Sequence, residues 1–144
     1  MRVALTVADF LNRAALVFGQ RVALQDEPAV AGSLGTQTYA ELEARARGMA
    51  LVLDDLGVGQ GERVAIVSPN SGRFLTAFFG VSGFGRILVP INFRLTTEEI
   101  AYVVEHSGAS VPSRQKRWLT LMVSTSSARS GSYRRTDAPE CSTT

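Results

Sequence analysis

Residues 62–91 read ERVAIVSPNSGRFLTAFFGVSGFGRILVPI, and this stretch decides the fold class. The continuous apolar run at 64–67 predicts a strand over 62–68, in a sheet that is covered on both faces. After Ser71, which suits a helix cap, apolar residues recur at helical spacing and predict a helix. A second apolar run at 87–89 predicts the next strand. Strand, helix and strand in this order predict a right-handed parallel unit, and therefore an α/β fold.

Regular elements are also predicted before this unit. Residues 6–18 carry apolar side chains at helical spacing and predict an amphipathic helix. Residues 21–26 alternate between apolar and polar, which predicts a half-buried strand with Val22 and Leu24 facing inward. The stretch 27–35 is rich in Pro, Gly and Ser, and it predicts a hairpin loop at the surface.

Two further helices are predicted from capping boxes, in which a Thr and a Glu three residues later satisfy two backbone N–H groups. The helices span about 38–56 and 96–106, and residues 109–111 have the character of a third strand that is just beginning. The capping pairs are Thr38 with Glu41 and Thr96 with Glu99. The expected core members are Phe10, Phe18, Leu53, Ile66, Phe78 and Val89.

This regular pattern stops at Pro112. Residues 1–111 carry nine Arg against eleven Asp and Glu, a net charge of −2, whereas residues 112–144 carry six basic against two acidic side chains, +4. Beyond Pro112 only residues 118–123 (WLTLMV) form an apolar run, which is suited to one strand or to a segment that associates through apolar contacts. We therefore divide the chain into a body, 1–111, and an unrelated basic tail, 112–144. The tail is either disordered or read in a changed frame, and we favour the changed frame.

Composition excludes several classes of protein. Cys141 is the only cysteine and His106 the only histidine, which excludes an internal disulfide and a His–Cys zinc cluster. The most apolar window, 74–91, is interrupted by Ser, Gly, Arg and Pro, so no membrane span is expected. The first apolar run ends at Asp9 and is too short for a secretory signal. We expect a soluble, cytoplasmic protein.

Short motifs follow one another in a fixed order over residues 5–111. They are TYAEL (38–42), LGVGQGERVA (56–65), SPNS (68–71), VPIN (89–92), RLT (94–96), EIAY (99–102) and HSGA (106–109). Each motif is weak alone. Their order and spacing together resemble the start of the adenylate-forming enzymes, and most closely the acyl-CoA synthetases and fatty-acid–CoA ligases.

The resemblance implies a fold and a chemistry. In that family a carboxylic acid attacks ATP to give an acyl-adenylate and pyrophosphate, and the thiol of coenzyme A then displaces AMP, with magnesium assisting the phosphate step. The body would be the N-terminal part of the family's large domain, incomplete in this chain. The intact family uses ATP, magnesium and coenzyme A.

The motifs that carry this chemistry in the family lie downstream of the matched region. They are a Ser/Thr/Gly-rich phosphate loop that ends in a lysine, a Tyr-Gly-x-Thr-Glu segment, an Asp that binds the ribose, and a lysine near the far C-terminus. None is present, and the single lysine, Lys116, has no glycine loop around it. No residue therefore inherits a catalytic, cofactor-binding or metal-binding role, and no cofactor is expected for this chain by itself.

One position departs from the family's pattern. The family usually has a turn of Ala-Gly-Ala character before the Val-Pro-x-Asn strand, whereas residues 83–86 here read GFGR. Gly85 suits the turn, but Arg86 stands where a small apolar residue is expected. Because an unpaired buried charge is costly, Arg86 must reach solvent or a partner.

Two glycine-rich stretches and a serine pair imitate active-site motifs. A phosphate loop opens a helix, but Gly57–Gly61 and Gly80–Gly85 come where predicted helices end, so helix stops and turns are the better interpretation. Ser68 and Ser71 flank a strand-to-helix turn like that of a nucleophile elbow. The elbow's glycines are missing, and His106 is the only histidine that could act as its base.

Charged residues on the last predicted helix and in the tail also have simpler interpretations. Of the acid/base candidates Glu98, Glu99 and Glu105, the first two lie in the first helical turn, and His106 lies in the last, where the helix dipole favours each charge. A basic group in the tail offers contacts for nucleic acid. It comprises Arg114, Lys116, Arg117, Arg134 and Arg135, beside Trp118. An out-of-frame sequence explains the group better, so no nucleic-acid partner is expected.

Three hypotheses about function remain. The first is a truncated acyl-CoA synthetase that is inactive on its own. The second is a non-catalytic module that binds a full-length relative, or the remainder of the enzyme, through an exposed sheet edge, which would also permit self-association. The third is a small adaptor protein with a basic tail.

Overall fold

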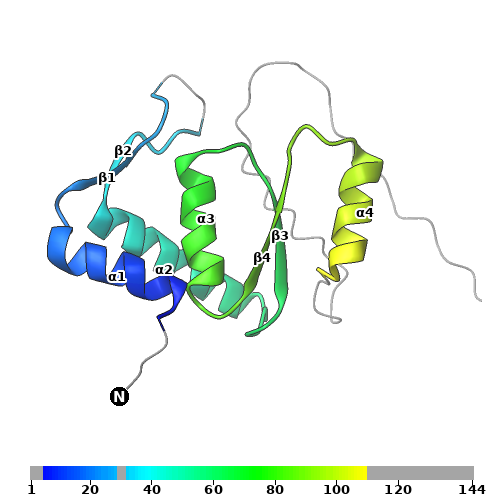
Figure 1. The fold of residues 1–144 in the computed structure, drawn as a ribbon, viewed down its shortest axis with the longest axis horizontal. Coiled ribbons are helices and arrows are strands. Elements are labelled where there is room, and N and C mark those ends of the chain that lie inside the picture. The colour runs from blue at the N-terminus through cyan, green and yellow to red at the C-terminus, as the bar shows by residue number, and fades with distance from the viewer. Residues whose placement is uncertain (1–4, 29–31, 110–144) are drawn as a thin grey trace, which may run out of the picture.

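The computed structural model describes residues 5–28 and 32–109 (Figure 1). Its elements in chain order are α1 (Val7–Phe18), β1 (Val22–Gln25), β2 (Thr36–Thr38), α2 (Tyr39–Asp55), β3 (Arg63–Val67), α3 (Gly72–Ser82), β4 (Ile87–Ile91) and α4 (Thr97–Ser107). Every helix predicted from the sequence is present within two residues of its expected bounds. The tail, and all but the first residue of the predicted strand at 109–111, lie outside the described residues.

β3 and β4 form the predicted parallel pair, and α3 connects them. Arg63 lies opposite Ile87 and Val67 opposite Ile91, without a shift in register. In Figure 1 the two strands stand between α3 and α4, and α1 and the β1–β2 hairpin lie on the far side of α3. α2 passes behind α3 toward the lower ends of the strands. A parallel pair needs a crossover connection, which α3 supplies. The α/β prediction is confirmed.

The two faces of this pair are covered unequally. On one face Val64 and Ile66 are buried in a cluster with α2 and α3. On the other face α4 contacts β4, and Ile91 is buried while Ile87 stays about half exposed. The prediction of a sheet covered on both faces therefore holds on the α2–α3 side, and only in part on the α4 side of the described residues.

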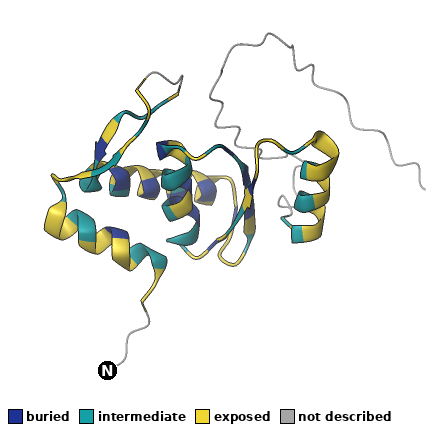
Figure 2. Cartoon of the chain, turned by 45° about the horizontal axis from the view of Figure 1, so that its top comes forward, coloured by how far each residue is buried: buried dark blue, intermediate teal, exposed yellow. Residues whose placement is uncertain are grey.

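The main core lies between α2, α3 and the parallel strands. Its buried members are Leu53, Val58, Val64, Ile66, Ala77 and Val81, and a second cluster of Leu11, Leu42 and Ala46 joins α1 to α2 (Figure 2). Leu53 and Ile66 are thus confirmed as core residues. The expectation was wrong for three phenylalanines, because Phe10, Phe18 and Phe78 are all exposed, and Val89 is only half-buried. For Phe10 and Phe18 the reason is that α1 buries a single residue, Leu11, and leaves its large side chains outside. Phe78 belongs to α3, where it lines a groove.

α2 and α3 approach each other closely at Gly80. A Cβ built on Gly80 would lie 2.9 Å from the carbonyl oxygen of Ala46 and 2.9 Å from the Cβ of Met49. Real Cβ atoms do not come so close in a packed interior, so any side chain at this position would push the helices apart. The small residue at 80 therefore sets the spacing of the layer that covers the sheet.

β1 and β2 form the predicted hairpin. They pair antiparallel, with Gln25 opposite Thr36, and the register shifts between Val22 and Leu24. The shift interrupts the alternation of the strand, so Ala23 and Leu24 both pack against the second cluster. Val22 is exposed, and the prediction that it faces inward was wrong.

The capping boxes predicted at Thr38 and Thr96 are present, and Thr6 with Asp9 forms a third. The backbone N–H of Thr38 donates to a carboxylate oxygen of Glu41 at 2.8 Å, and the Thr38 hydroxyl adds a second bond at 3.0 Å. These bonds favour the ionised form and hold the pKa of Glu41 below its ordinary value. The same arrangement with Thr6 lowers the pKa of Asp9.

Ile66→Ala is expected to lower the free energy of unfolding by about 2–5 kcal/mol, because Ile66 is fully buried and its loss leaves a cavity. Phe10→Ala removes more atoms but should cost less than about 1 kcal/mol, because Phe10 is 65% exposed. Urea unfolding followed by circular dichroism measures both variants. Equal losses would contradict this assignment of the core.

The capping box of α2 should make stability depend on pH in acid. Since the pKa of Glu41 is lowered in the folded state, its contribution is present above the ordinary value of 4.5 and is lost as the pH falls through the lowered folded pKa. Glu41→Gln, which keeps a side chain able to cap, should therefore be less stable than the parent at pH 6 and similar to it at pH 2. Urea midpoints at the two values test this, and a difference that does not change with pH would refute it.

Candidate functional site

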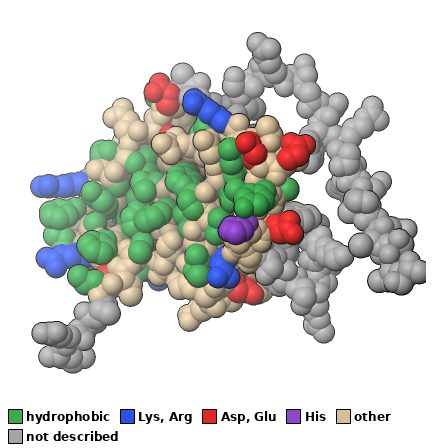
Figure 3. Space-filling view, turned by 45° about the vertical axis from the view of Figure 1, so that its right-hand side comes forward, with side chains coloured by type: hydrophobic (Ala, Val, Ile, Leu, Met, Phe, Trp, Pro, Cys, Tyr) green, Lys and Arg blue, Asp and Glu red, His purple; other side chains and the backbone are tan. Residues whose placement is uncertain are grey.

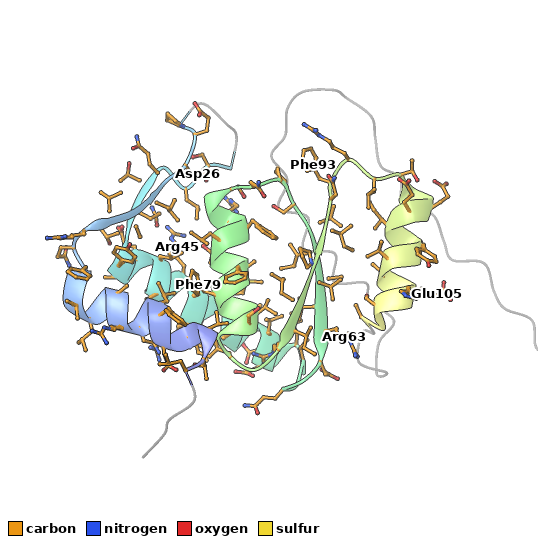
Figure 4. The ribbon with its side chains drawn as sticks, viewed as in Figure 1. Asp26, Arg45, Arg63, Phe79, Phe93 and Glu105 are labelled. Atoms are coloured by element: carbon orange, nitrogen blue, oxygen red, sulfur yellow. The ribbon has the colours of Figure 1, made fainter. Side chains whose placement is uncertain are left out.

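A groove opens where β3 and β4 end, and this is the place where parallel α/β sheets most often bind ligands. The groove is open to solvent and has a volume of about 700 Å³, and we call it the strand-end groove. Its apolar side chains include Phe74 and Phe78 of α3, Leu88 and Pro90 of β4, and Phe93. Figure 4 shows Phe93 beyond the upper end of the strands.

Three polar side chains around this groove, those of Ser68, Ser71 and Asn92, make hydrogen bonds within local turns. The Ser71 hydroxyl accepts a hydrogen bond from the backbone N–H of Phe74 at 3.2 Å, and the Ser68 hydroxyl donates to the carbonyl of Pro69 at 2.8 Å. Asn92 accepts from the backbone N–H of Arg94 at 3.0 Å. The Arg94 guanidinium lies over the ring of Phe93, 5.4 Å from its centre. The groove therefore combines apolar and polar side chains, and no nucleophile lies next to a base among them.

The glycine-rich stretch 57–61 forms a turn between α2 and β3, as predicted. Gly57 and Gly61 both have positive φ, +76° and +78°, which favours glycine. Their N–H groups donate to the carbonyls of Asp54 and Gly85, so they are not free for a phosphate. Gly80 and Gly83 lie at the end of α3, which likewise confirms the helix-end interpretation.

The serine pair and the histidine are not brought together. Ser68 and Ser71 lie in the turn between β3 and α3, whereas His106 lies in the last turn of α4, which points to the opposite end of the molecule in Figure 1. The His106 ring stacks on Tyr102, with ring centres 5.4 Å apart. The serines therefore have no base beside them, and Ser71 acts as the predicted helix cap.

The glutamates of α4 are exposed at its surface. Glu99 accepts from the backbone N–H of Thr96 at 2.8 Å in the capping box, while Glu98 and Glu105 are exposed to solvent. Within residues 5–28 and 32–109, no three His, Cys, Asp or Glu side chains are grouped so that they could hold a metal ion. The predicted basic group of the tail lies outside these residues.

Arg86 is buried, and its guanidinium has hydrogen-bond partners, as expected for a charge at this position. The residue is only 5% exposed, and its guanidinium donates to the carbonyl of Val58 at 2.9 and 2.7 Å and to the carboxylate of Asp54. Gly85, with φ of +80°, provides the turn that directs Arg86 inward. The ion pair links the end of α2 to the start of β4.

Sequence reasoning missed Asp54 and Val58 as the partners of Arg86, and it missed the groove. Asp54 and Arg86 are 32 residues apart, and nothing in the local pattern indicates their pairing. The groove could have been inferred from the polar residues at the two strand ends, Ser68 and Asn92, because parallel strands end at one edge.

None of the helices within the described part of the chain is both long and apolar enough to span a membrane. The observation agrees with the interrupted apolar window of residues 74–91.

Comparison with known proteins identifies similarity to AMP-binding enzymes, among them CoA ligases. The model of the family described as AMP-binding enzyme matches residues 11–126. A long-chain-fatty-acid–CoA ligase of Thermus thermophilus is 42% identical over 103 residues, which cover 72% of this chain and 19% of the ligase. A 3-hydroxybenzoate–CoA ligase of an Aromatoleum species is 33% identical over 99 residues, 67% of this chain and 19% of that enzyme. The chain thus spans about a fifth of the length of these curated relatives.

Solved structures agree with the sequence comparison. The crystal structure of the N-terminal domain of FACL13 from Mycobacterium tuberculosis superposes with a TM-score of 0.67 at 34% identity, covering 74% of this chain and 26% of that domain's chain. The arrangement of helices and parallel strands is therefore similar to that at the start of these larger proteins.

Removing Arg86 should destabilise the protein more than removing its ionic partner. Arg86→Ala leaves the Val58 carbonyl without its donors and creates a cavity, with an expected loss of about 2–4 kcal/mol. Asp54→Asn should cost about 1 kcal/mol or less, because the Asp54 side chain is 64% exposed and Arg86 keeps its bonds to Val58. Urea unfolding tests this order, and a larger loss for Asp54→Asn would overturn it.

Proposed function

Because the chain belongs to the AMP-binding enzyme family, we propose that residues 1–111 form the N-terminal part of the large domain of an acyl-CoA ligase. We also propose that this chain is truncated relative to the active enzyme and does not form acyl-adenylates by itself. One observation carries the second statement: the chain has a single lysine, Lys116, and no Ser/Thr/Gly-rich loop ends in it. Adenylation requires cations and amides preorganised around a triphosphate.

The described residues do not fit ATP with a magnesium ion. The N–H groups of Gly57, Val58 and Gly61 donate to backbone carbonyls, and that of Gly59 donates to the Glu62 carboxylate. No lysine lies within residues 5–28 and 32–109. The acidic side chains of the same residues form no metal-binding group. We therefore assign ATP, magnesium and coenzyme A to parts of the family's domain that this chain does not contain.

The proposed reaction of the intact enzyme is the ATP-dependent joining of a carboxylic acid to coenzyme A. The names of the two curated relatives give a long-chain fatty acid in one case and 3-hydroxybenzoate in the other. The two ligases match a similar share of this chain, so we propose a carboxylic acid as the substrate class. A fatty acid is favoured because the fatty-acid ligase has the higher sequence identity, 42% against 33%.

We further propose that the sequence after Val111 is read in a different frame from the body. The loss of apolar periodicity and the change of net charge from −2 to +4 support this boundary. The family match continues through residues 112–126, so the proposed change of frame falls inside the matched range. Translation of the nucleotide sequence past codon 111 in the other two frames decides it. A continuing strand and a later phosphate loop that ends in a lysine are expected in one of them.

A second candidate function is that of a binding module for a larger acyl-CoA ligase. The observation that favours it is the strand-end groove with its exposed apolar side chains Phe78 and Phe93. In this case the chain would bind the remainder of a ligase and complete it.

We expect no ATP–pyrophosphate exchange from the purified chain with palmitate or with 3-hydroxybenzoate. The measurement compares the chain with its heat-inactivated sample, and an intact long-chain-fatty-acid–CoA ligase serves as the positive control. Exchange above the heat-inactivated level would contradict the proposal.

A mixing experiment separates the two candidates. The chain is added to a Thermus ligase that lacks its matched N-terminal segment, and exchange is measured again. No recovery is expected for an inactive part of an enzyme, whereas restored exchange would establish the binding module.

A further inference from the structure

We infer that the outer edge of β3, the edge that faces away from β4, pairs antiparallel with the same edge of a second copy of this chain. The two copies then share one sheet of four strands. The inference does not depend on the proposed function. It rests on the backbone groups that β3 directs away from β4, on Pro90 in β4, and on the pairing that β3 can make with itself.

Alternate residues of β3 direct their backbone groups away from β4. The N–H of Ile87 donates to the carbonyl of Glu62 at 2.9 Å, and the parallel register places Arg63 opposite Ile87. Because successive residues of a strand direct their backbone groups to opposite sides, those of Arg63, Ala65 and Val67 lie along the outer edge. Within residues 5–28 and 32–109 the sheet has two strands, so no third strand of this part covers the edge. Such an edge is a template for another strand.

The outer edge of β4 is less able to pair. Ile87 directs its N–H to β3, so the same alternation turns the backbone of Leu88 and Pro90 outward. Proline has no N–H, and a proline on an edge strand prevents the addition of another strand. β3 reads RVAIV and contains neither proline nor lysine. The strands of the hairpin have only four and three residues, so β3 offers the longest unblocked edge among the described strands.

β3 can pair with a second β3 about a two-fold axis at Ala65. Two-fold symmetry makes the pairing antiparallel, and it places Arg63 opposite Val67 of the second copy. The two Arg63 side chains are then four residues apart along the strands, about 14 Å, so like charges do not lie opposite each other. Val64 lies opposite Ile66 of the second copy on the face that α2 and α3 cover, which continues the apolar layer. Because Pro90 blocks both remaining edges, the assembly ends at two copies.

Apolar side chains remain exposed at the end of α2 that packs on β3. Leu53 is buried in one cluster with the residues of β3, whereas Val52 and Leu56 beside it are about half exposed. Figure 3, in which the strand and α4 side of the molecule comes forward, shows hydrophobic side chains over the middle of this face with charged ones around them. Exposed apolar surface favours association, and a sheet of four strands is more typical than one of two.

Charges at position 67 test both the edge and the register. Val67→Arg places an Arg opposite Arg63 of the second copy, twice in each dimer, and should weaken dimerisation about tenfold or more. Val67→Glu forms two pairs of opposite charge and should dimerise as strongly as the parent or more strongly. Val22→Arg is the matched control, because Val22 is exposed on β1, and it should dimerise like the parent. Sedimentation equilibrium over a wide range of concentration gives the dissociation constants, and circular dichroism confirms that each variant is folded.

A cross-link tests the position of the two-fold axis. Ala65 would lie opposite Ala65 of the second copy with Cα atoms about 5.5 Å apart, a distance that a disulfide can span. Ala65→Cys, in a chain in which Cys141→Ser removes the natural thiol, should give a covalent dimer on mild oxidation. Val22→Cys in the same background should remain a single chain on a non-reducing gel.

Three outcomes would overturn the inference. The first is a parent chain that is monomeric at all concentrations. The second is a dimer to which Val67→Arg and Val67→Glu do the same, which assigns the contact to another surface. The third is a dimer in which Ala65→Cys cross-links no better than Val22→Cys.

Discussion

The parallel pairing of β3 with β4 is the constraint on which the rest of the structure depends. Parallel strands need a helical crossover, and α3 supplies it. α2 packs closely against α3, and Gly80 permits that approach next to Ala46 and Met49. The main core is the product of these contacts, and the α1–α2 cluster is built onto the outside of the same layer.

The buried guanidinium of Arg86 lies where the end of α2 meets the start of β4. Arg86 begins the turn into β4, and it is held by the Val58 carbonyl and by Asp54, so the end of α2, the glycine turn and the start of β4 form one connected unit. Gly61 adds a backbone bond to Gly85, and Ile87 adds another to Glu62. A buried ion pair is seldom a net source of stability, but it fixes which groups must meet. In this chain it replaces the small apolar residue that the family resemblance predicted.

Within residues 5–28 and 32–109, the strand-end groove brings no nucleophile next to a base. The groove lies where an α/β sheet binds ligands, and apolar side chains with a polar rim surround it. The glycine turns lie at helix ends, and the amides of Gly57, Gly61 and Gly83 donate to backbone carbonyls. The chain matches about a fifth of the length of a long-chain-fatty-acid–CoA ligase, so the described residues correspond to a small part of that protein.

Local chemistry in the sequence determined the element order, the helix starts and the α/β class. Capping boxes at Thr38 and Thr96, the serine cap at 71 and the apolar runs at 64–67 and 87–89 act within a few residues, so their effect can be read without a structure. Only the tertiary structure decided which apolar faces are covered and which distant groups pair. Phe10 and Phe18 have helical periodicity but lie outside the core, because α1 packs through Leu11 alone. The partner of Arg86 and the groove at the strand ends arise from segments brought together by the crossover, and burial of this kind depends on contacts between residues far apart in the chain.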